Sequence, residues 1–171
     1  TDHECVDYEY AMAEARNGMQ VLIREGSAAR NLDAIVKGIV EHHTDTSGFC
    51  FCTDDKHIDD LSKNGSIDTS IKMCIKNGLA PEIAIQMATL NAAECYNLKN
   101  KGAIAPSYIA DFIILDNLEE FKINSVYKNG KLIVKDNKLV IDIADLYSAP
   151  ILNNSINLPK LTKDSLKIDI K

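Results

Sequence analysis

Hydrophobic and polar residues follow two different periods along the first half of the chain. In three stretches, apolar side chains recur every three or four residues, which is the spacing of one face of an α-helix. Two short apolar runs of strand length, at 19–23 and 49–52, lie between these stretches. Strands that alternate with helices pair in parallel through right-handed crossovers, so the pattern predicts an α/β fold. The three helical stripes are Tyr8, Ala11, Met12 and Ala15; Leu32, Ile35, Val36 and Ile39; and Ile67, Ile71, Cys74 and Ile75.

Residues that begin or end helices flank these stretches. Gly18 is placed to end the first helix in a left-handed conformation, and Ser27 can begin the second helix as its N-cap. Pro81 suits the first position of a further helix, and Asn91 with Glu94 three residues later resembles a capping box that begins another. We therefore expect two short helices after the third amphipathic one.

The pattern of the second half of the chain predicts strands and turns. A strand is predicted at 111–116, and two more at 125–128 and 131–134 flank Asn129-Gly130, the strongest short signal for a β-hairpin. A further strand is expected at 138–141. From residue 148 onward the pattern is poor, which indicates a linker or the start of a further C-terminal region.

Composition and charge exclude several classes of protein. The 46% hydrophobic content is enough to build a core, but 171 residues are too few for a complete (β/α)8 barrel, which needs about 250. The net charge of −6 provides no basic face, so we expect neither nucleic acid nor a membrane as a partner. The N-terminal residues resemble neither a signal peptide nor a translation start, which indicates a piece of a larger protein. Five scattered cysteines do not form a disulfide framework, and we expect a cytoplasmic protein.

Polar residues gather where the predicted strands end. The segments are 2–4 before the first helix, 24–27 after the first apolar run, and 53–55 after the second. In parallel β/α folds this edge carries function, although each polar group alone is also typical of a solvent-facing helix cap. His3 and Asp54 offer an imidazole and a carboxylate, which suit a divalent metal, yet a catalytic centre normally takes three or more protein ligands.

The other histidines and the cysteines have plainer interpretations. His42 and His43 lie at a predicted helix end and are expected to be a solvated pair or one favoured by the helix dipole, while His57 is a weaker site candidate. Cys50 and Cys52 share one face of a strand, but no second pair stands at the spacing of a zinc site. We expect these two thiols to be buried and inert.

The residues of the second half resemble a known superfamily. The segment 102–116, GAIAPSYIADFIILD, with 88–93 before it and 126–131 after it, is similar to the C-terminal signature of the amidohydrolase superfamily. Within that superfamily, 23–32 (IREGSAARNL) and 51–55 (FCTDD) resemble the adenine deaminase family. The resemblance covers roughly residues 1 to 145; Ser107 and Ile58 depart from it, where Gly and Pro are usual.

The resemblance implies a fold and a division of the chain. The chain would be the C-terminal part of an amidohydrolase (β/α)8 barrel plus strands of a small β-sandwich. Residues 1–98 would form the last β/α units of the metal-dependent barrel and 99–147 the sandwich strands. Residues 148–171 would be a linker or the start of a further region.

The resemblance also implies roles for individual residues. His3 corresponds to the metal-binding histidine of the sixth barrel strand, and Asp54 to the eighth-strand aspartate that touches metal and moves a proton. The loop of Arg24, Glu25, Gly26 and Ser27 corresponds to the rim near the purine. Two neighbours, Asp55 and Glu4, are weaker candidates of the same site.

The implied reaction is the hydrolysis of adenine in purine salvage. Manganese or iron, with zinc as a further option, lowers the pKa of a bound water. The resulting hydroxide attacks C6 of adenine, Asp54 moves the proton, and ammonia leaves to give hypoxanthine. The remaining metal ligands of the family would precede Thr1, so we expect the isolated chain to be inactive. We also expect a homo-oligomer.

Two other interpretations stay open on the sequence. The superfamily signature alone also permits another cyclic amidohydrolase, such as a dihydropyrimidinase or imidazolonepropionase relative. Alternatively, the chain is a noncatalytic scaffold whose exposed strand edges assemble with a partner.

Overall fold

The computed structural model describes residues 1–142 and 156–167. By their internal contacts, Thr1–Val140 form one compact unit and Ile141–Lys171 a second. In the second unit, the described residues include one short 3-10 helix, η3 (Lys163–Leu166). Of the segment predicted at 148–171, residues 148–155 and 168–171 lie outside the described residues.

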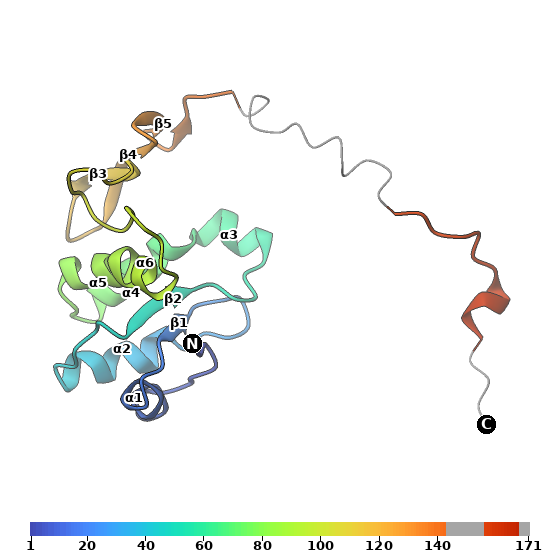
Figure 1. Ribbon diagram of the computed structural model, residues 1–171, viewed down its shortest axis with the longest axis horizontal. Helices are drawn as coiled ribbons and strands as arrows, with labels where there is room; N and C mark the ends of the chain where they lie inside the picture. Colours follow the sequence, from blue (N-terminus) through green and yellow to red (C-terminus); the bar gives the residue numbers. More distant parts are fainter. Residues whose placement is uncertain (143–155, 168–171) are drawn as a thin grey trace. The chain divides into compact units, whose positions relative to one another are not determined.

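Parallel strands form the centre of the first unit (Figure 1). β1 (Val21–Arg24) pairs with β2 (Phe49–Cys52) in parallel, with Val21 opposite Phe49 and Arg24 opposite Cys52. On the other edge of β1, Asp2 forms a parallel bridge with Val21. Three chain segments thus run side by side in one direction, which confirms the predicted parallel pairing.

Helices cover these strands, as the amphipathic stripes predict. The sequence-predicted helices are α1 (Tyr8–Arg16), α2 (Leu32–Glu41), α4 (Ile67–Lys76), α5 (Pro81–Ala88) and α6 (Leu90–Cys95). α1 and α2 contact β1, whereas α4, α5 and α6 contact β2. Gly18 ends α1 with a φ of +82°, and Pro81 begins α5, both as expected.

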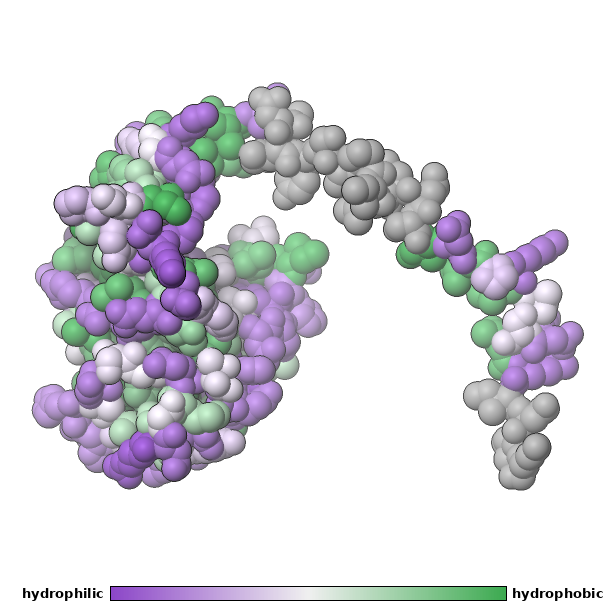
Figure 2. Space-filling model, viewed as in Figure 1, coloured by the Kyte–Doolittle hydropathy of each residue, from purple (hydrophilic) through white to green (hydrophobic). Residues whose placement is uncertain are grey.

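One hydrophobic core lies between the strands and the helices. Ile23 and Phe49 of the strands are almost completely buried against Leu32 and Ile35 of α2 and Met87 of α5. Figure 2 shows hydrophilic residues over much of the visible face of this unit. Burial of the apolar stripes therefore stabilises the arrangement that positions the strand ends.

Two predicted helix caps are wrong. α2 begins at Leu32, with Asn31 and not Ser27 at the N-cap position, because Glu25 and Arg30 form an antiparallel bridge that delays the helix. Asn91 does not cap α6, where the N-cap is Thr89. These two predicted caps make tertiary contacts instead.

Asn91 is a buried link between α6 and the start of β2. Its side chain is 2% exposed, and its Nδ2 donates to the carbonyl oxygens of Thr46 at 2.7 Å and Phe49 at 2.9 Å. Buried carbonyl groups need a donor, and this amide provides one to each. Asn91 therefore helps to fix the position of the strand that precedes Asp54.

The sequence does not predict α3 (Ile58–Asn64), which follows β2 after the connection 53–57. None of its residues is buried, and Ile58 is 83% exposed. A helix without a buried apolar face lacks the periodic signal on which the other predictions depend.

The second sheet is antiparallel and contains β3 (Phe112–Asn117), β4 (Lys122–Lys128), β5 (Lys131–Lys135) and β6 (Lys138–Leu139), in that order. Asn129 and Gly130 turn between β4 and β5 with φ values of 50° and 74°, which confirms the predicted hairpin. β6 is shorter than the predicted 138–141. Among the described residues, no helix is long and apolar enough to cross a membrane.

Candidate functional site

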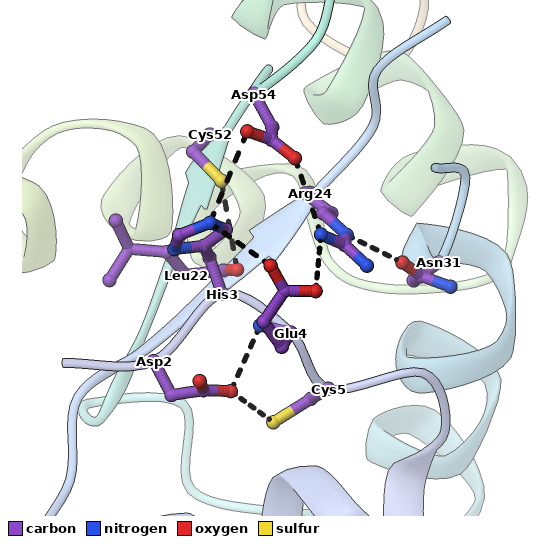
Figure 3. A network of polar contacts seen from close by, with 9 residues as sticks. All are labelled: Asp2, His3, Glu4, Cys5, Leu22, Arg24, Asn31, Cys52 and Asp54. Atoms are coloured by element: carbon purple, nitrogen blue, oxygen red, sulfur yellow. Dashed lines mark hydrogen bonds and ion pairs between the residues drawn. The ribbon is translucent and has the colours of Figure 1, made fainter. Parts of the chain in front are cut away.

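Four polar residues from three chain segments meet at the carboxyl ends of the parallel strands (Figure 3). His3 and Glu4 follow the bridge at Asp2, Arg24 ends β1, and Asp54 follows β2. The three segments are parallel, so their polar ends reach the same edge. The structure thus brings together residues that are separated by up to about fifty positions in the chain.

Arg24 lies at the centre of this cluster. Its Nη1 is 2.6 Å from Glu4 Oε2 and 3.2 Å from Asp54 Oδ2. Its Nε donates to Asn31 Oδ1 at 2.9 Å, and the side chain is only 12% exposed. Burial acts to lower the pKa of Arg24, but the hydrogen bonds and charges of the two carboxylates raise it overall. Arg24 is therefore a fixed cation between two carboxylates.

His3 and Asp54 face each other across the strand ends. His3 Nε2 lies 4.0 Å from Asp54 Oδ1 and 3.4 Å from Glu4 Oε1. Asp54 adopts a left-handed backbone with a φ of 49°, which aspartate tolerates better than most residues. The two oxygens of Asp54 thus have different neighbours, since Oδ2 contacts Arg24 and Oδ1 faces His3.

The donors at this edge fit a divalent metal in kind but not in number. An imidazole nitrogen and a carboxylate oxygen are ligands that zinc, iron and manganese accept. Within residues 1–142 and 156–167, no group of three or more His, Cys, Asp or Glu side chains is arranged to hold a metal ion. His3 and Asp54 could therefore contribute two ligands to a centre that needs others.

The loop after β1 packs tightly against the loop after β2. A Cβ on Gly26 would lie 1.9 Å from Asp55 Oδ1 and 2.8 Å from the carbonyl oxygen of Thr53, so a larger residue would force these atoms to move. Glu25 is 8% exposed, and its Oε2 has no hydrogen-bond partner. Burial raises the pKa of Glu25, while the backbone amide of Leu32 acts in the opposite direction.

Ser27 and Asp55 join the two loops to each other. Asp55 Oδ2 accepts from the backbone N–H of Ala28 at 2.9 Å, and this hydrogen bond lowers the pKa of Asp55. The Ser27 hydroxyl donates to Asp60 Oδ2 at 2.5 Å and accepts from the backbone N–H of His57 at 2.9 Å. These side chains therefore hold the rim loops in place.

The cysteines near this edge are free thiols. Burial raises the pKa of Cys50 to about 12 and that of Cys52 to about 11. The Cys52 thiol donates weakly to the carbonyl oxygen of Leu22 at 3.8 Å. Both thiols are therefore protonated near neutral pH.

Sequence reasoning missed part of the cluster. The sequence indicated Glu4 only as a weaker site candidate, although Glu4 makes the shortest contact with Arg24. It indicated no role in the site for Asn31. Asn31 directly precedes a helix, and in a sequence such an asparagine indicates a cap. Only the arrangement in space directs its side chain to Arg24.

A surface pocket of about 390 Å³ lies away from this cluster. It is lined by Val40 at the end of α2, by His43 in the connection after α2, and by Leu79 in the connection from α4 to α5. None of its lining residues belongs to the cluster around Arg24.

Comparisons with known proteins identify relatives of this chain in the amidohydrolase family. A sequence model described as "Amidohydrolase family" matches residues 12–133. The chain is 54% identical to an adenine deaminase of Desulfitobacterium hafniense over 170 residues, which are 99% of this chain and 29% of that protein. It is 42% identical to an adenine deaminase of Clostridium acetobutylicum over 99% of this chain and 30% of that protein. The chain thus spans less than a third of the length of these curated relatives.

A solved structure shows the same fold. The β-aspartyl dipeptidase of Fervidobacterium islandicum AW-1 aligns with 77% of this chain and 37% of its own, with a TM-score of 0.61 and 21% sequence identity. At this identity the likeness concerns the fold alone.

Proposed function

The chain belongs to the amidohydrolase family, and from that premise we propose that it is part of an adenine deaminase, which hydrolyses adenine to hypoxanthine and ammonia. One observation carries the proposal: His3, Arg24 and Asp54 meet at the carboxyl ends of three parallel segments. Enzymes with parallel β/α barrels have their active sites at this edge. The high identity to two adenine deaminases supports the choice of substrate.

We further propose that residues 1–98 are the last β/α units of a (β/α)8 barrel. The parallel pairing of Asp2, β1 and β2 supports this interpretation, as does the covering of the strands by helices. Residues 99–147 would contribute strands to a small β-sandwich, a role that suits the antiparallel sheet of β3 to β6. Residues 148–171 would be a linker or the start of a further C-terminal region.

His3 and Asp54 are the residues that would hold a divalent metal, manganese or iron in first place. When bound, such an ion would acidify water, so that a nucleophile exists near neutral pH. The remaining ligands would come from other parts of the full-length protein. Purified protein that contains metal should lose much of it on His3→Ala substitution.

Asp54 would move the proton in this reaction. Its Oδ2 contacts Arg24, whereas Oδ1 faces His3 at 4.0 Å and is the atom placed for proton transfer. An oxygen of water forms the new bond to C6 of adenine while the C6=N1 double bond opens and its electron pair moves to N1, and one water proton passes to Oδ1. Asp54 then returns this proton to the amino nitrogen, the electron pair on N1 forms the double bond to C6 again, and the bond between C6 and the amino nitrogen breaks as ammonia leaves. The second water proton moves from the oxygen to N1, which gives hypoxanthine.

The loop of residues 24–27 would line the substrate. Glu25 Oε2 is a buried acceptor without a partner, which suits an N–H group of a purine. Gly26 lets the loop approach Asp55 closely, while Ser27 and Asp55 hold the loop against α3. The loop would thus be rigid before the substrate arrives.

The test uses the full-length protein that contains these residues, purified with Mn²⁺ or Fe²⁺ and incubated with adenine. Chromatography should show hypoxanthine and ammonia in equal amounts. Asp54→Asn should reduce kcat by about 10²–10⁴-fold, the usual contribution of a general acid–base group. Asp59→Asn is the matched control, because this exposed residue of α3 lies outside the cluster and its substitution should leave kcat unchanged.

Other outcomes would overturn the proposal. Hydrolysis of a dihydropyrimidine or an imidazolone, with no turnover of adenine, would identify another cyclic amidohydrolase. No turnover of any of these compounds by a metal-loaded, folded protein would favour a noncatalytic scaffold.

A further inference from the structure

The Arg24 guanidinium is held from two sides. Nη1 points to Glu4 and Asp54, while Nε donates to Asn31 Oδ1 at 2.9 Å. Because a guanidinium is planar and rigid, a hydrogen bond at Nε fixes the direction in which Nη1 points. The contact with Asn31 therefore determines where the cation meets the two carboxylates.

The Asn31 side chain binds Arg24 in place of the backbone N–H groups that an N-cap asparagine usually binds. It occupies the N-cap position of α2, where asparagine is among the preferred residues, yet its side chain forms no capping hydrogen bond. A residue that gives up a favourable local contact for a tertiary one often serves a functional site.

We propose that Asn31 is a positioning residue that acts on Asp54 through Arg24. The inference rests on the proposed function, in which Asp54 moves a proton. With Asn31 in place, Arg24 holds Oδ2 of Asp54 and leaves Oδ1 toward His3. Without it, the guanidinium can turn toward Glu4 alone, which it already contacts at 2.6 Å, and Asp54 loses its fixed orientation.

The neutral amide suits this role better than a carboxylate would. Arg24 already faces Glu4 and Asp54, so a third negative charge would compete with Asp54 for the cation. An amide oxygen accepts the Nε–H without adding charge. Asn31→Asp should therefore keep the hydrogen bond and restore part of the activity that Asn31→Ala loses.

A double-mutant cycle in the full-length protein tests the coupling. Asn31→Ala should lower kcat for adenine about 10-fold with KM changed by less than about 2-fold, because positioning affects the chemical step. Arg24→Ala should lower kcat further, and adding Asn31→Ala to it should change kcat by less than about 2-fold. Lys37→Ala, at an exposed position of the same helix, is the control and should leave kcat unchanged.

Independent effects would overturn the inference. If Asn31→Ala lowers kcat as much in the Arg24→Ala background as in the wild type, Asn31 does not act through Arg24. Equal kcat values for Asn31→Ala and the wild type would overturn it as well. Urea unfolding of each variant separates these results from a loss of folding.

A spectroscopic readout separates this inference from the proposed function. In protein labelled with ¹⁵N-arginine, the Nε–H signal of Arg24, assigned by its loss in Arg24→Lys, should be sharp and exchange slowly with water. It should broaden in Asn31→Ala and persist in Asn31→Asp; an unchanged signal in Asn31→Ala would overturn the orienting contact. A wild-type protein that never turns over adenine would overturn the proposed function, whatever this signal shows.

Discussion

Asn91 offers a sharp test of how the strand before Asp54 is held. Its amide is 2% exposed and donates to the carbonyl oxygens of Thr46 and Phe49. Replacement by leucine keeps a similar volume but removes both donors. The backbone N–H of Phe49 also donates to the Thr46 oxygen at 3.0 Å, so that carbonyl keeps a partner. The Asn91→Leu substitution therefore destabilises the protein mainly through the Phe49 carbonyl, which loses the hydrogen bond from Asn91.

The magnitude follows from these contacts. A hydrogen bond contributes about 1 kcal/mol net, and a buried polar group left without a partner costs about 1–3 kcal/mol. We expect Asn91→Leu to lower the free energy of unfolding by about 2–4 kcal/mol. Asn91→Asp should cost more at neutral pH, because a carboxylate would face two carbonyl oxygens.

The pH dependence of the Asn91→Asp variant has a definite sign. Burial among acceptors raises the pKa of the new carboxyl above its unfolded value of about 3.9. The variant should therefore lose stability as the pH rises from about 4, and regain part of it in acid, where the protonated group can donate.

Urea unfolding followed by circular dichroism measures these differences, with an unchanged m value as the check that the folded state is comparable. Asn17→Leu is the control, because Asn17 is exposed and its side-chain Nδ2 donates to the carbonyl oxygen of Ala13 within α1. It should change the free energy of unfolding by less than about 0.5 kcal/mol. An Asn91→Leu variant as stable as this control would refute the role assigned to Asn91.

Four further predictions follow from other parts of the structure. Gly26→Ala should lower the free energy of unfolding by about 1–3 kcal/mol because its Cβ has no room, whereas Gly48→Ala, in open space, should change it little in the same urea titration. Hydrogen bonds from Lys101 and Lys128 lower the pKa of Asp111, so Asp111→Asn should reduce Tm above pH 3.8. The difference in Tm between the wild type and this variant should shrink as the pH falls below 3.8, because Asp111 then becomes protonated, and Tm measured against pH checks this. Cys50 and Cys74, whose pKa values burial raises to about 12, should resist alkylation at pH 7 until urea unfolds the chain, as mass spectrometry can show. The isolated 171-residue chain should give no hypoxanthine from adenine even with Mn²⁺, because its described residues contain no group of three metal ligands; hypoxanthine detected by chromatography would contradict this.

The candidate site could be predicted in outline because it depends on topology. Arg24 and Asp54 each follow a short apolar run, and His3 follows Asp2, which pairs in parallel with β1, so that the three side chains reach one edge. No detailed packing is needed for that inference. The same reasoning explains why α3 was missed, since a helix without a buried face leaves no periodic pattern.

Contacts of polar side chains near helix starts could not be predicted. Ser27, Asn31 and Asn91 each match a local rule for capping, and in each the side chain binds a tertiary partner instead. An uncapped N–H group at a surface helix end can bind water at little cost. A buried carbonyl, as at Asn91, or a buried guanidinium, as at Asn31, has no such alternative, so these two asparagine side chains bind their tertiary partners.

Apart from α3, the order of the elements, the parallel pairing and the edge where polar residues gather could be predicted from the sequence, because they depend on hydrophobic period and chain direction. Which oxygen of Asp54 meets Arg24, and which residue orients Arg24, depended on distances between segments far apart in the chain. Those distances are set by the packing of helices on strands, and only the tertiary structure contains them.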